Sequence, residues 1–289
     1  MNLPDFDFYA PESVQETCEV LDRLGSQAKI ISGGTDMLVK MKYGQLSPKV
    51  LVSIKNLSQL TKNYYEKGKG VIIGAMATHN DIVNSPLLQE KYPSVCKAAH
   101  HMANNQIRNI GTIGGNIVNA VPSADLPPIL IALGASVKLV GCSRERTIPL
   151  EDFFAGPGES VIAQDEILTE VIIPDQSSTG STYIKYGLRR SGALAVVGVA
   201  AAVTMDGDVC KDVKIVLGAV APVPLRAIKA EELLKDKPVT KEILEEAGKC
   251  AAAESKPISD IRGSAEYRRD MVRVFTKRAL AKAAREGHV

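Results

Sequence analysis

Two glycine-centred segments constrain the fold of this chain more than any other feature of its sequence. They run from Ser32 to Asp36 and from Thr112 to Asn116, and each contains a Gly-Gly pair beside apolar, strand-like residues. Paired glycines let the backbone adopt positive φ and leave N–H groups open to an anion. One such turn is a common requirement of a fold. Two of them predict a pair of loops that close on one extended phosphate ligand.

Neither segment carries a familiar nucleotide-binding pattern. A P-loop needs Lys and then Ser or Thr after its last glycine, and a Rossmann site needs Gly-x-Gly-x-x-Gly. Both patterns are missing from the two segments. From the residues alone, each segment is therefore either a tight turn that the fold requires or a nest of N–H groups for phosphate oxygens.

Composition excludes several classes of protein. The 289 residues carry a net charge of +2 with both signs interspersed, and they include no Trp. A nucleic-acid partner would call for a basic patch and for aromatic side chains on which bases stack. We therefore expect a globular chain with no nucleic-acid partner.

The five cysteines and the apolar runs bear on metal sites and compartment. Cysteines stand at 18, 96, 142, 210 and 250, at least forty residues apart, whereas zinc and iron–sulfur sites use closely spaced thiolates. The N-terminal residues lack the pattern of a signal peptide, and the longest apolar run, 193–203, is too short to cross a bilayer. These features predict reduced thiols, no metal site, no membrane span and a cytoplasmic location.

Periodicity and capping residues predict alternating helices and strands in the first part of the chain. Strands are expected at 28–31, 50–54, 70–74, 135–140 and 167–173. Helices are expected at 14–25, from 79 onward, at 92–105 and at 126–133.

A polar stretch at 174–181 predicts the main domain boundary. Three antiparallel strands are expected beyond it, at 183–188, 193–205 and 213–220, followed by helices at 225–235, 240–253 and 264–284. The fold class is therefore α+β. We divide the chain into domains at 1–176 and 177–289, with subdomains of the first at about 1–57 and 58–176.

The segments Lys29–Asp36 and Gln106–Asn116 carry a resemblance that extends over nearly the whole chain. It continues through Ser123–Asp125, Asp165–Leu168 and Ile172–Pro174. These residues resemble the FAD-binding medium subunits of molybdenum hydroxylases, the family of the xanthine dehydrogenases. The resemblance implies a two-part FAD-binding domain of the vanillyl-alcohol-oxidase (PCMH) type, followed by a C-terminal domain with a three-stranded antiparallel sheet and helices.

The resemblance also implies which residues touch a non-covalently bound FAD. The two Gly-Gly segments fall where the family holds the FAD diphosphate, in agreement with the expectation for a nest. It implies no catalytic residue and no metal ligand on this chain. The implied cofactor-binding residues are Ile30, Ile31, Ser32, Gly33, Gly34, Thr35, Asp36, Met37, Met102, Ile107, Thr112, Gly114, Gly115, Asn116, Ser123, Asp125, Leu168 and Lys185.

Four of these residues have competing interpretations. Asp125 matches a family residue that contacts the adenosine portion of FAD, but it also stands where a helix N-cap is expected. Lys185 matches a lysine near the isoalloxazine, where a cation stabilises a reduced flavin, and is otherwise a surface lysine. Leu168 and Met102 match positions near the cofactor and also suit an apolar core.

The resemblance implies a relay of electrons. In this family a large partner subunit carries molybdopterin and oxidises the substrate, and a small one carries two [2Fe–2S] clusters. The FAD subunit passes their electrons to NAD⁺ or another acceptor, and whether Arg189 and Arg190 attract such a dinucleotide is left open. Two alternatives remain: a self-sufficient FAD-dependent oxidoreductase of the same fold superfamily, and a scaffold that has lost FAD.

Overall fold

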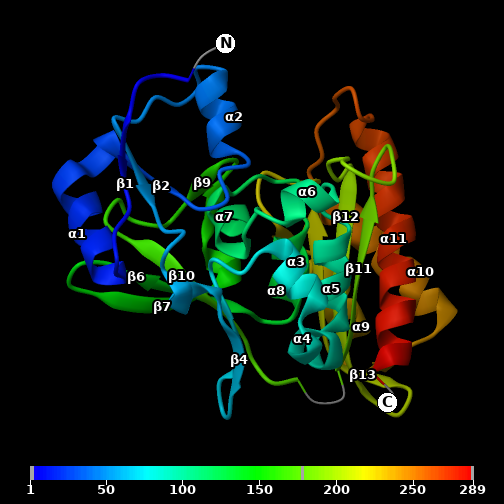
Figure 1. The fold of residues 1–289 in the computed structure, drawn as a ribbon. Coiled ribbons are helices and arrows are strands. Elements are labelled where there is room, and N and C mark those ends of the chain that lie inside the picture. The colour runs from blue at the N-terminus through cyan, green and yellow to red at the C-terminus, as the bar shows by residue number, and fades with distance from the viewer. Residues whose placement is uncertain (1–2, 177–178, 288–289) are drawn as a thin grey trace.

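Four layers of secondary structure build the molecule, as Figure 1 shows from left to right. The computed structural model describes residues 3–176 and 179–287. A five-stranded antiparallel sheet is followed by a layer of short helices, then by a second antiparallel sheet, and finally by two long helices. A small parallel sheet at the N-terminus lies beside the first of these layers.

The N-terminal part is a small α/β unit. Its sheet has the order β1 (Asp7–Tyr9), β3 (Val50–Ser53), β2 (Ala28–Ile31), with parallel pairing throughout. Helix α1 (Val14–Leu24) begins where the Ser13 hydroxyl accepts from the N–H of Glu16, and it buries Cys18, Val20 and Leu21. Helix α2 (Met37–Lys42) follows the first glycine segment directly.

The first large sheet has the order β4 (Asn63–Glu66), β5 (Gly70–Gly74), β10 (Ile167–Ile173), β6 (Ser136–Val140), β7 (Glu145–Pro149). Strands β8 (Phe154–Gly156) and β9 (Glu159–Ser160) form a separate hairpin. Six short helices lie between β5 and β6: α3 (His79–Asn84), α4 (Pro86–Lys91), α5 (Pro93–His100), α6 (Asn105–Arg108), α7 (Ile113–Val118) and α8 (Leu126–Ala132).

The second large sheet begins with β11 (Thr179–Tyr186), β12 (Val197–Asp206) and β13 (Val209–Gly218), which pair antiparallel. The two-residue strands β14 (Leu225–Arg226) and β15 (Lys237–Pro238) both pair with β13. Helices α9 (Ile228–Leu234), α10 (Lys241–Glu254) and α11 (Ala265–Glu286) complete the chain. Strand β12 is buried on both faces, which explains its nearly continuous apolar sequence.

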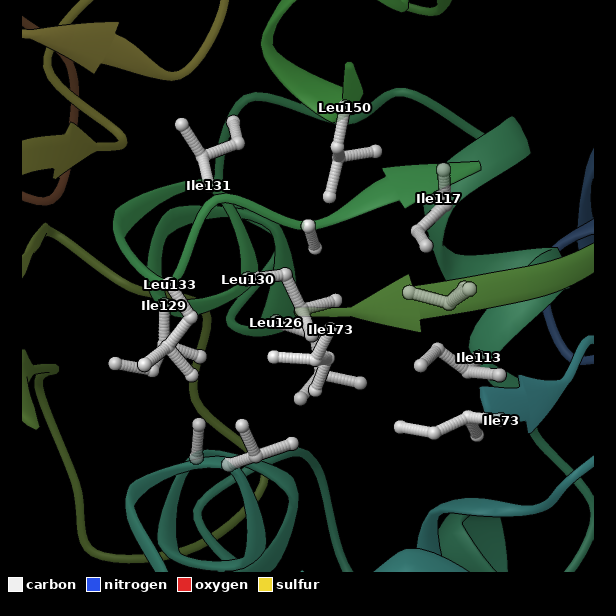
Figure 2. Packing of buried hydrophobic residues seen from close by; sticks show 14 of the residues in the cluster. Ile73, Ile113, Ile117, Leu126, Ile129, Leu130, Ile131, Leu133, Leu150 and Ile173 are labelled. Carbon is white, nitrogen blue, oxygen red and sulfur yellow. The ribbon is translucent and has the colours of Figure 1, made fainter. Parts of the chain in front are cut away.

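Two hydrophobic cores cover the two faces of the second sheet. One core joins the first large sheet, helices α5 and α8, and the Tyr183, Ala200 and Val216 side chains of the second sheet. Figure 2 shows part of it, including Leu126, Ile129 and Leu130 of α8 and Ile173 of β10. The other core lies between the second sheet and helices α9, α10 and α11. Helix α8 is therefore buried between the two sheets.

The structure corrects several expected elements. Strands β1, β4 and β7 were not predicted, and the three-stranded tail sheet gains β14 and β15. The expected helix at 92–105 ends at His100, because Ala103 has a positive φ of 42° and Asn104 caps a new helix, α6. The predicted boundary between residues 176 and 177 adjoins residues 177–178, which lie outside the described residues, so this division stays a prediction.

Candidate cofactor site

The two glycine segments lie against each other, eighty residues apart in sequence. The Ser32 hydroxyl lies 3.1 Å from the Thr112 hydroxyl. A Cβ added at Gly33 would overlap the carbonyl oxygen of Ile110, and one added at Gly115 would lie 3.1 Å from the Ser32 hydroxyl. The convergence that the sequence predicted is therefore confirmed, and we call residues 32–36 and 112–116 the glycine cradle.

The second segment of the cradle differs from the expected turn. Thr112 is the N-cap of α7, and its hydroxyl accepts from the N–H of Gly115 at 3.1 Å. Gly114 and Gly115 have helical backbone angles, whereas Gly34 has a φ of +72°. A nest that needs positive φ is therefore wrong for the second segment. The N–H groups of its first helical turn already have acceptors: Gly115 donates to the Thr112 hydroxyl and Asn116 to Thr112 O.

Close backbone packing fixes the second segment on the first large sheet. The N–H of Gly114 donates to Ala75 O, and the N–H of Ala75 donates to Thr169 O, both at 2.9 Å. A Cβ on Gly114 would approach the Ala75 carbonyl oxygen to 2.8 Å, so glycine is required by packing. The register of β10 shifts between Leu168 and Glu170, and such bulges are common beside functional sites. Leu168 itself is buried in the core.

The remaining residues of the first segment form a half-buried wall. Ile30, Ile31, Thr35 and Met37 are partly buried, and so is Ile107 of α6, which precedes the second segment. Asp36 is exposed and makes no side-chain bond that caps α2. Thr35 donates to the Asp36 carboxylate at 3.5 Å.

A further link joins the two helices that leave the cradle. The Lys40 ammonium of α2 donates to the amide oxygen of Asn119 at 2.7 Å. Sequence reasoning missed both residues because their contact joins positions 79 residues apart. Lys40 and Asn119 each follow a glycine segment within four residues, and this placement was the sequence feature that could have indicated their contact.

Asp125 and Lys185 form a buried ion pair. Their side chains are 2.7 Å apart and only 4% and 9% exposed. The Tyr183 hydroxyl donates to the other Asp125 oxygen at 2.9 Å, and the Lys185 ammonium also donates to His101 O. Burial raises the pKa of the Asp125 carboxyl, and the Lys185 charge opposes that shift.

This pairing overturns one expectation, the helix-capping role of the Asp125 side chain. The Asp125 side chain does not cap α8, because both of its oxygens are already bonded to Tyr183 and Lys185. The resemblance placed Asp125 at the adenosine end of FAD and Lys185 at the flavin end. The ion pair places the two residues beside each other, and which portion of FAD each one contacts stays a prediction.

Met102 and Asn116 meet between the cradle and this ion pair. The Asn116 amide nitrogen lies 4.0 Å from the Met102 sulfur, and its amide oxygen is buried without a hydrogen-bond partner. Met102 is largely buried, as is Ser123. A buried acceptor without a donor is costly, so Asn116 Oδ1 fits a ligand that brings a donor to it. FAD carries such donors on its ribityl chain, and its diphosphate suits the N–H groups of the cradle.

Two further groups lie at the edge of the site, His79 and the pair Arg189 and Arg190, whose contact with a dinucleotide was left open. His79 is 2% exposed under the second segment, with its N–H donating to Gly111 O, and burial lowers its pKa to about 4. Arg189 and Arg190 are exposed on the loop 187–196. The N–H of Gly192 holds that loop on Ala103 O, next to Met102.

A metal cluster and a membrane-spanning helix are both absent from the described residues. Among residues 3–176 and 179–287, no group of three or more His, Cys, Asp or Glu side chains could hold a metal ion. In the same ranges, none of the helices is both long and apolar enough to cross a membrane.

Comparisons with known proteins agree over nearly the whole chain. Residues 4–176 match the family described as the FAD binding domain in molybdopterin dehydrogenase, and residues 182–283 match the CO dehydrogenase flavoprotein C-terminal domain. The carbon monoxide dehydrogenase medium chain of Hydrogenophaga pseudoflava is 36% identical over 278 residues, 96% of each chain. The nicotine 6-hydroxylase medium subunit of Paenarthrobacter nicotinovorans is 34% identical over 98% of this chain and 99% of the relative.

Solved structures give the same result. Carbon monoxide dehydrogenase from Hydrogenophaga pseudoflava matches with a TM-score of 0.95 over 99% of both chains, at 36% identity. Together with the two family matches and the glycine cradle, this similarity places the chain plainly: it belongs to the FAD-binding medium subunits of the molybdenum hydroxylase family.

Proposed function

We propose that this chain binds FAD non-covalently and relays electrons within a molybdenum hydroxylase complex. It takes electrons from [2Fe–2S] clusters on a small subunit and passes them to NAD⁺ or another acceptor. A large subunit carries molybdopterin and oxidises the substrate. The observation that carries this proposal is the contact between the two glycine segments, at Ser32 and Thr112, in a chain whose relatives are named medium chains.

We assign the hold on the diphosphate to the backbone of the glycine cradle. The N–H groups of its first segment bind phosphate oxygens without bringing a side-chain charge, and the Ser32 and Thr112 hydroxyls fix the spacing of the two segments. Ile30, Ile31, Met37 and Ile107 supply the apolar walls. Met102, Asn116, Ser123 and Leu168 line the path from the cradle toward Lys185.

The ion pair of Asp125 and Lys185 supplies the electrostatics of the site. FAD, when bound, supplies the exchange between single-electron donors and two-electron acceptors, and reduction adds negative charge to its ring. Lys185 provides a fixed positive charge, which Asp125 and His101 O orient. We therefore give Asp125 a positioning role through Lys185, in place of a contact with adenosine. No acid–base residue on this chain is required.

The division into domains at 1–176 and 177–289 belongs to the same proposal, as does a cytoplasmic location. The five cysteines are all free, which supports a reducing compartment. The first domain carries the glycine cradle, and the second contributes Lys185 and Tyr183 across the boundary.

A test uses the complex purified from its own host. We expect one FAD per copy of this chain, a cofactor released by mild denaturation, and flavin reduction that requires the iron–sulfur subunit. A copy of the chain that retains no FAD in the native complex overturns the proposal. So does an isolated chain that oxidises an organic substrate unaided, which is the outcome expected of a self-sufficient flavoenzyme.

A further inference from the structure

The segment between α5 and α6 offers its backbone carbonyls to both halves of the cofactor site. His101 O accepts from the Lys185 ammonium at 3.1 Å, and Met102 O accepts from the Arg108 guanidinium at 2.9 Å. Lys185 belongs to the buried ion pair, whereas Arg108 lies four residues before the second glycine segment. Two adjacent carbonyls therefore connect the ion pair with the cradle. We call residues 101–103 the carbonyl turn.

The conformation of the carbonyl turn depends on its contacts with the rest of the molecule. Ala103 has a φ of 42°, in the left-handed region that residues other than glycine seldom adopt. Such a backbone persists only where the surrounding structure holds it, and it is common at functional sites. The surrounding contacts here are the two cationic donors and the N–H of Gly192, which donates to Ala103 O at 2.8 Å. Loss of one of these donors should therefore loosen the turn.

Arg108 is oriented by a network of amide side chains. Its Nε donates to the Asn80 amide oxygen at 3.2 Å, while another nitrogen of the guanidinium donates to Met102 O. The Asn80 amide nitrogen donates in turn to the side-chain oxygens of Asn105 and Asn109. This network joins α3 to α6, and hydrogen bonds in a connected network strengthen one another. The guanidinium is therefore held on two sides.

No ion pair explains why an arginine occupies position 108. Its side-chain acceptors, Asn80 Oδ1 and Met102 O, are neutral, and its guanidinium forms no salt bridge within residues 3–176 and 179–287. Arg108 is partly buried, so its charge carries a desolvation cost that no carboxylate offsets. We attribute the arginine to its rigid fork of donors, which bonds the carbonyl turn and Asn80 at once.

We propose that Arg108 is a positioning residue for the flavin, and that it acts through the carbonyl turn on Lys185. The inference rests on the proposed function, since it concerns the flavin that this chain is proposed to hold. Arg108 fixes Met102 O and thereby the adjacent His101 O. His101 O and the Asp125 carboxylate are the two acceptors of the Lys185 ammonium. Without Arg108, the ammonium keeps only the Asp125 bond, and its charge is less well placed to stabilise a reduced flavin.

The test measures flavin potentials in the intact complex for a double-mutant cycle. Arg108→Gln should lower the potential in the same direction as Lys185→Ala and by less, because it disturbs one of two acceptors of Lys185. The double variant should have the potential of Lys185→Ala alone, because the side chain that Arg108 positions is gone. Additive shifts would mean that the Arg108 charge acts on the flavin directly, and they overturn the proposal. An unchanged potential in Arg108→Gln also overturns it.

A second variant removes the orientation of Arg108 and keeps its charge. Asn80→Ala takes away the acceptor of Arg108 Nε, so we expect it to shift the potential in the same direction as Arg108→Gln. Arg273→Gln is the matched control. Arg273 is also partly buried, but it bonds Glu245 between α10 and α11, which cover the opposite face of the second sheet. It should leave the potential unchanged. No shift in Asn80→Ala, or an equal one in Arg273→Gln, contradicts the positioning role.

Hydrogen exchange of the complex stripped of its FAD gives a readout that does not depend on the flavin. Arg108→Gln should speed exchange of the Gly192 amide by about tenfold, the effect of losing one hydrogen bond to a charged group in the turn that holds it. Amides of α10 should exchange at the wild-type rate, which confirms that the variant is folded. Unchanged exchange at Gly192 overturns this inference and leaves the proposed function standing. A wild-type complex purified without FAD contradicts the proposed function itself.

Discussion

The glycine cradle and the Asp125–Lys185 pair are two halves of one site that are built on opposite principles. The cradle consists of backbone N–H groups, two hydroxyls and glycines too close to their neighbours to carry a Cβ. The ion pair consists of two full charges and a phenol, buried between α8 and β11. A substitution in the cradle acts by steric overlap, whereas a substitution in the ion pair acts by leaving a charge without its partner.

The largest expected effect is in the cradle. Gly33→Ala places a methyl group on the carbonyl oxygen of Ile110, so the two segments must separate. Gly114→Val forces a similar movement against Ala75. We expect both variants to lose their FAD while most of the fold remains, because the rest of the core is untouched. The ratio of flavin absorbance to protein absorbance after purification measures this loss.

A matched control separates cradle geometry from backbone strain. Gly34 and Gly207 have φ of 72° and 54°, so valine costs about 1–2 kcal/mol of strain at each. Gly34→Val should lose FAD, and Gly207→Val, in the turn between β12 and β13, should keep it. Full flavin content in Gly34→Val would remove the first segment from the site.

The next effect concerns the ion pair. Lys185→Ala leaves the Asp125 carboxylate buried without a cation, so we expect a loss of about 3–5 kcal/mol in the free energy of unfolding. We also expect the flavin potential to change more than FAD affinity, since Lys185 supplies charge and the cradle supplies binding. Denaturant titration and potentiometry measure the two effects. An unchanged potential would exclude Lys185 from tuning the flavin.

A second substitution shows whether Asp125 acts through Lys185. Combining Lys185→Ala with Asp125→Asn should recover stability, because the unpaired charge is removed. Burial raises the pKa of Asp125 in the folded state. The stability that this carboxyl contributes is therefore present at low pH and lost as the pH rises through its raised pKa. The deficit of Lys185→Ala should shrink on acidification, and an effect independent of pH would contradict this account.

The smallest expected effect is a loss of stability at low pH, caused by protonation of His79 beneath the cradle. His79 lies beneath Gly111, and burial, with the Arg108 charge, lowers its pKa from 6.5 to about 4. The stability gained by keeping His79 neutral is present above pH 6.5 and falls as the pH drops toward 4, by up to about 3 kcal/mol. His79→Gln should flatten this part of the pH–stability curve. An unaltered curve would show that another group is responsible.

The sequence could predict the features of the cradle that local chemistry determines. Gly-Gly pairs beside strands indicated two close approaches of the backbone, and Gly33 and Gly114 make such approaches. The resemblance added the cofactor and the order of the domains. Strong apolar runs such as 70–74 and 167–173 became the central strands β5 and β10 because burial on both faces leaves a clear pattern.

Features set by distant parts of the chain could not be predicted. Asp125 looks like an N-cap locally, and only the folded chain brings Lys185, sixty residues later, to its carboxylate. Strands β1 and β7 were missed because their residues are largely exposed and lack an apolar alternation. The isolated bridge between Thr78 and Thr112 also joins parts of the chain that are distant in sequence.

Because Ser32 and Thr112 come from segments eighty residues apart, both segments must be folded before the chain can bind its cofactor. A nascent polypeptide emerging from the ribosome has no dinucleotide site until the second segment has been translated and packed on β5. FAD therefore cannot direct the early steps of folding. It binds late and stabilises the folded protein by mass action. In a cell starved of riboflavin, this protein should be made and folded normally but degraded faster.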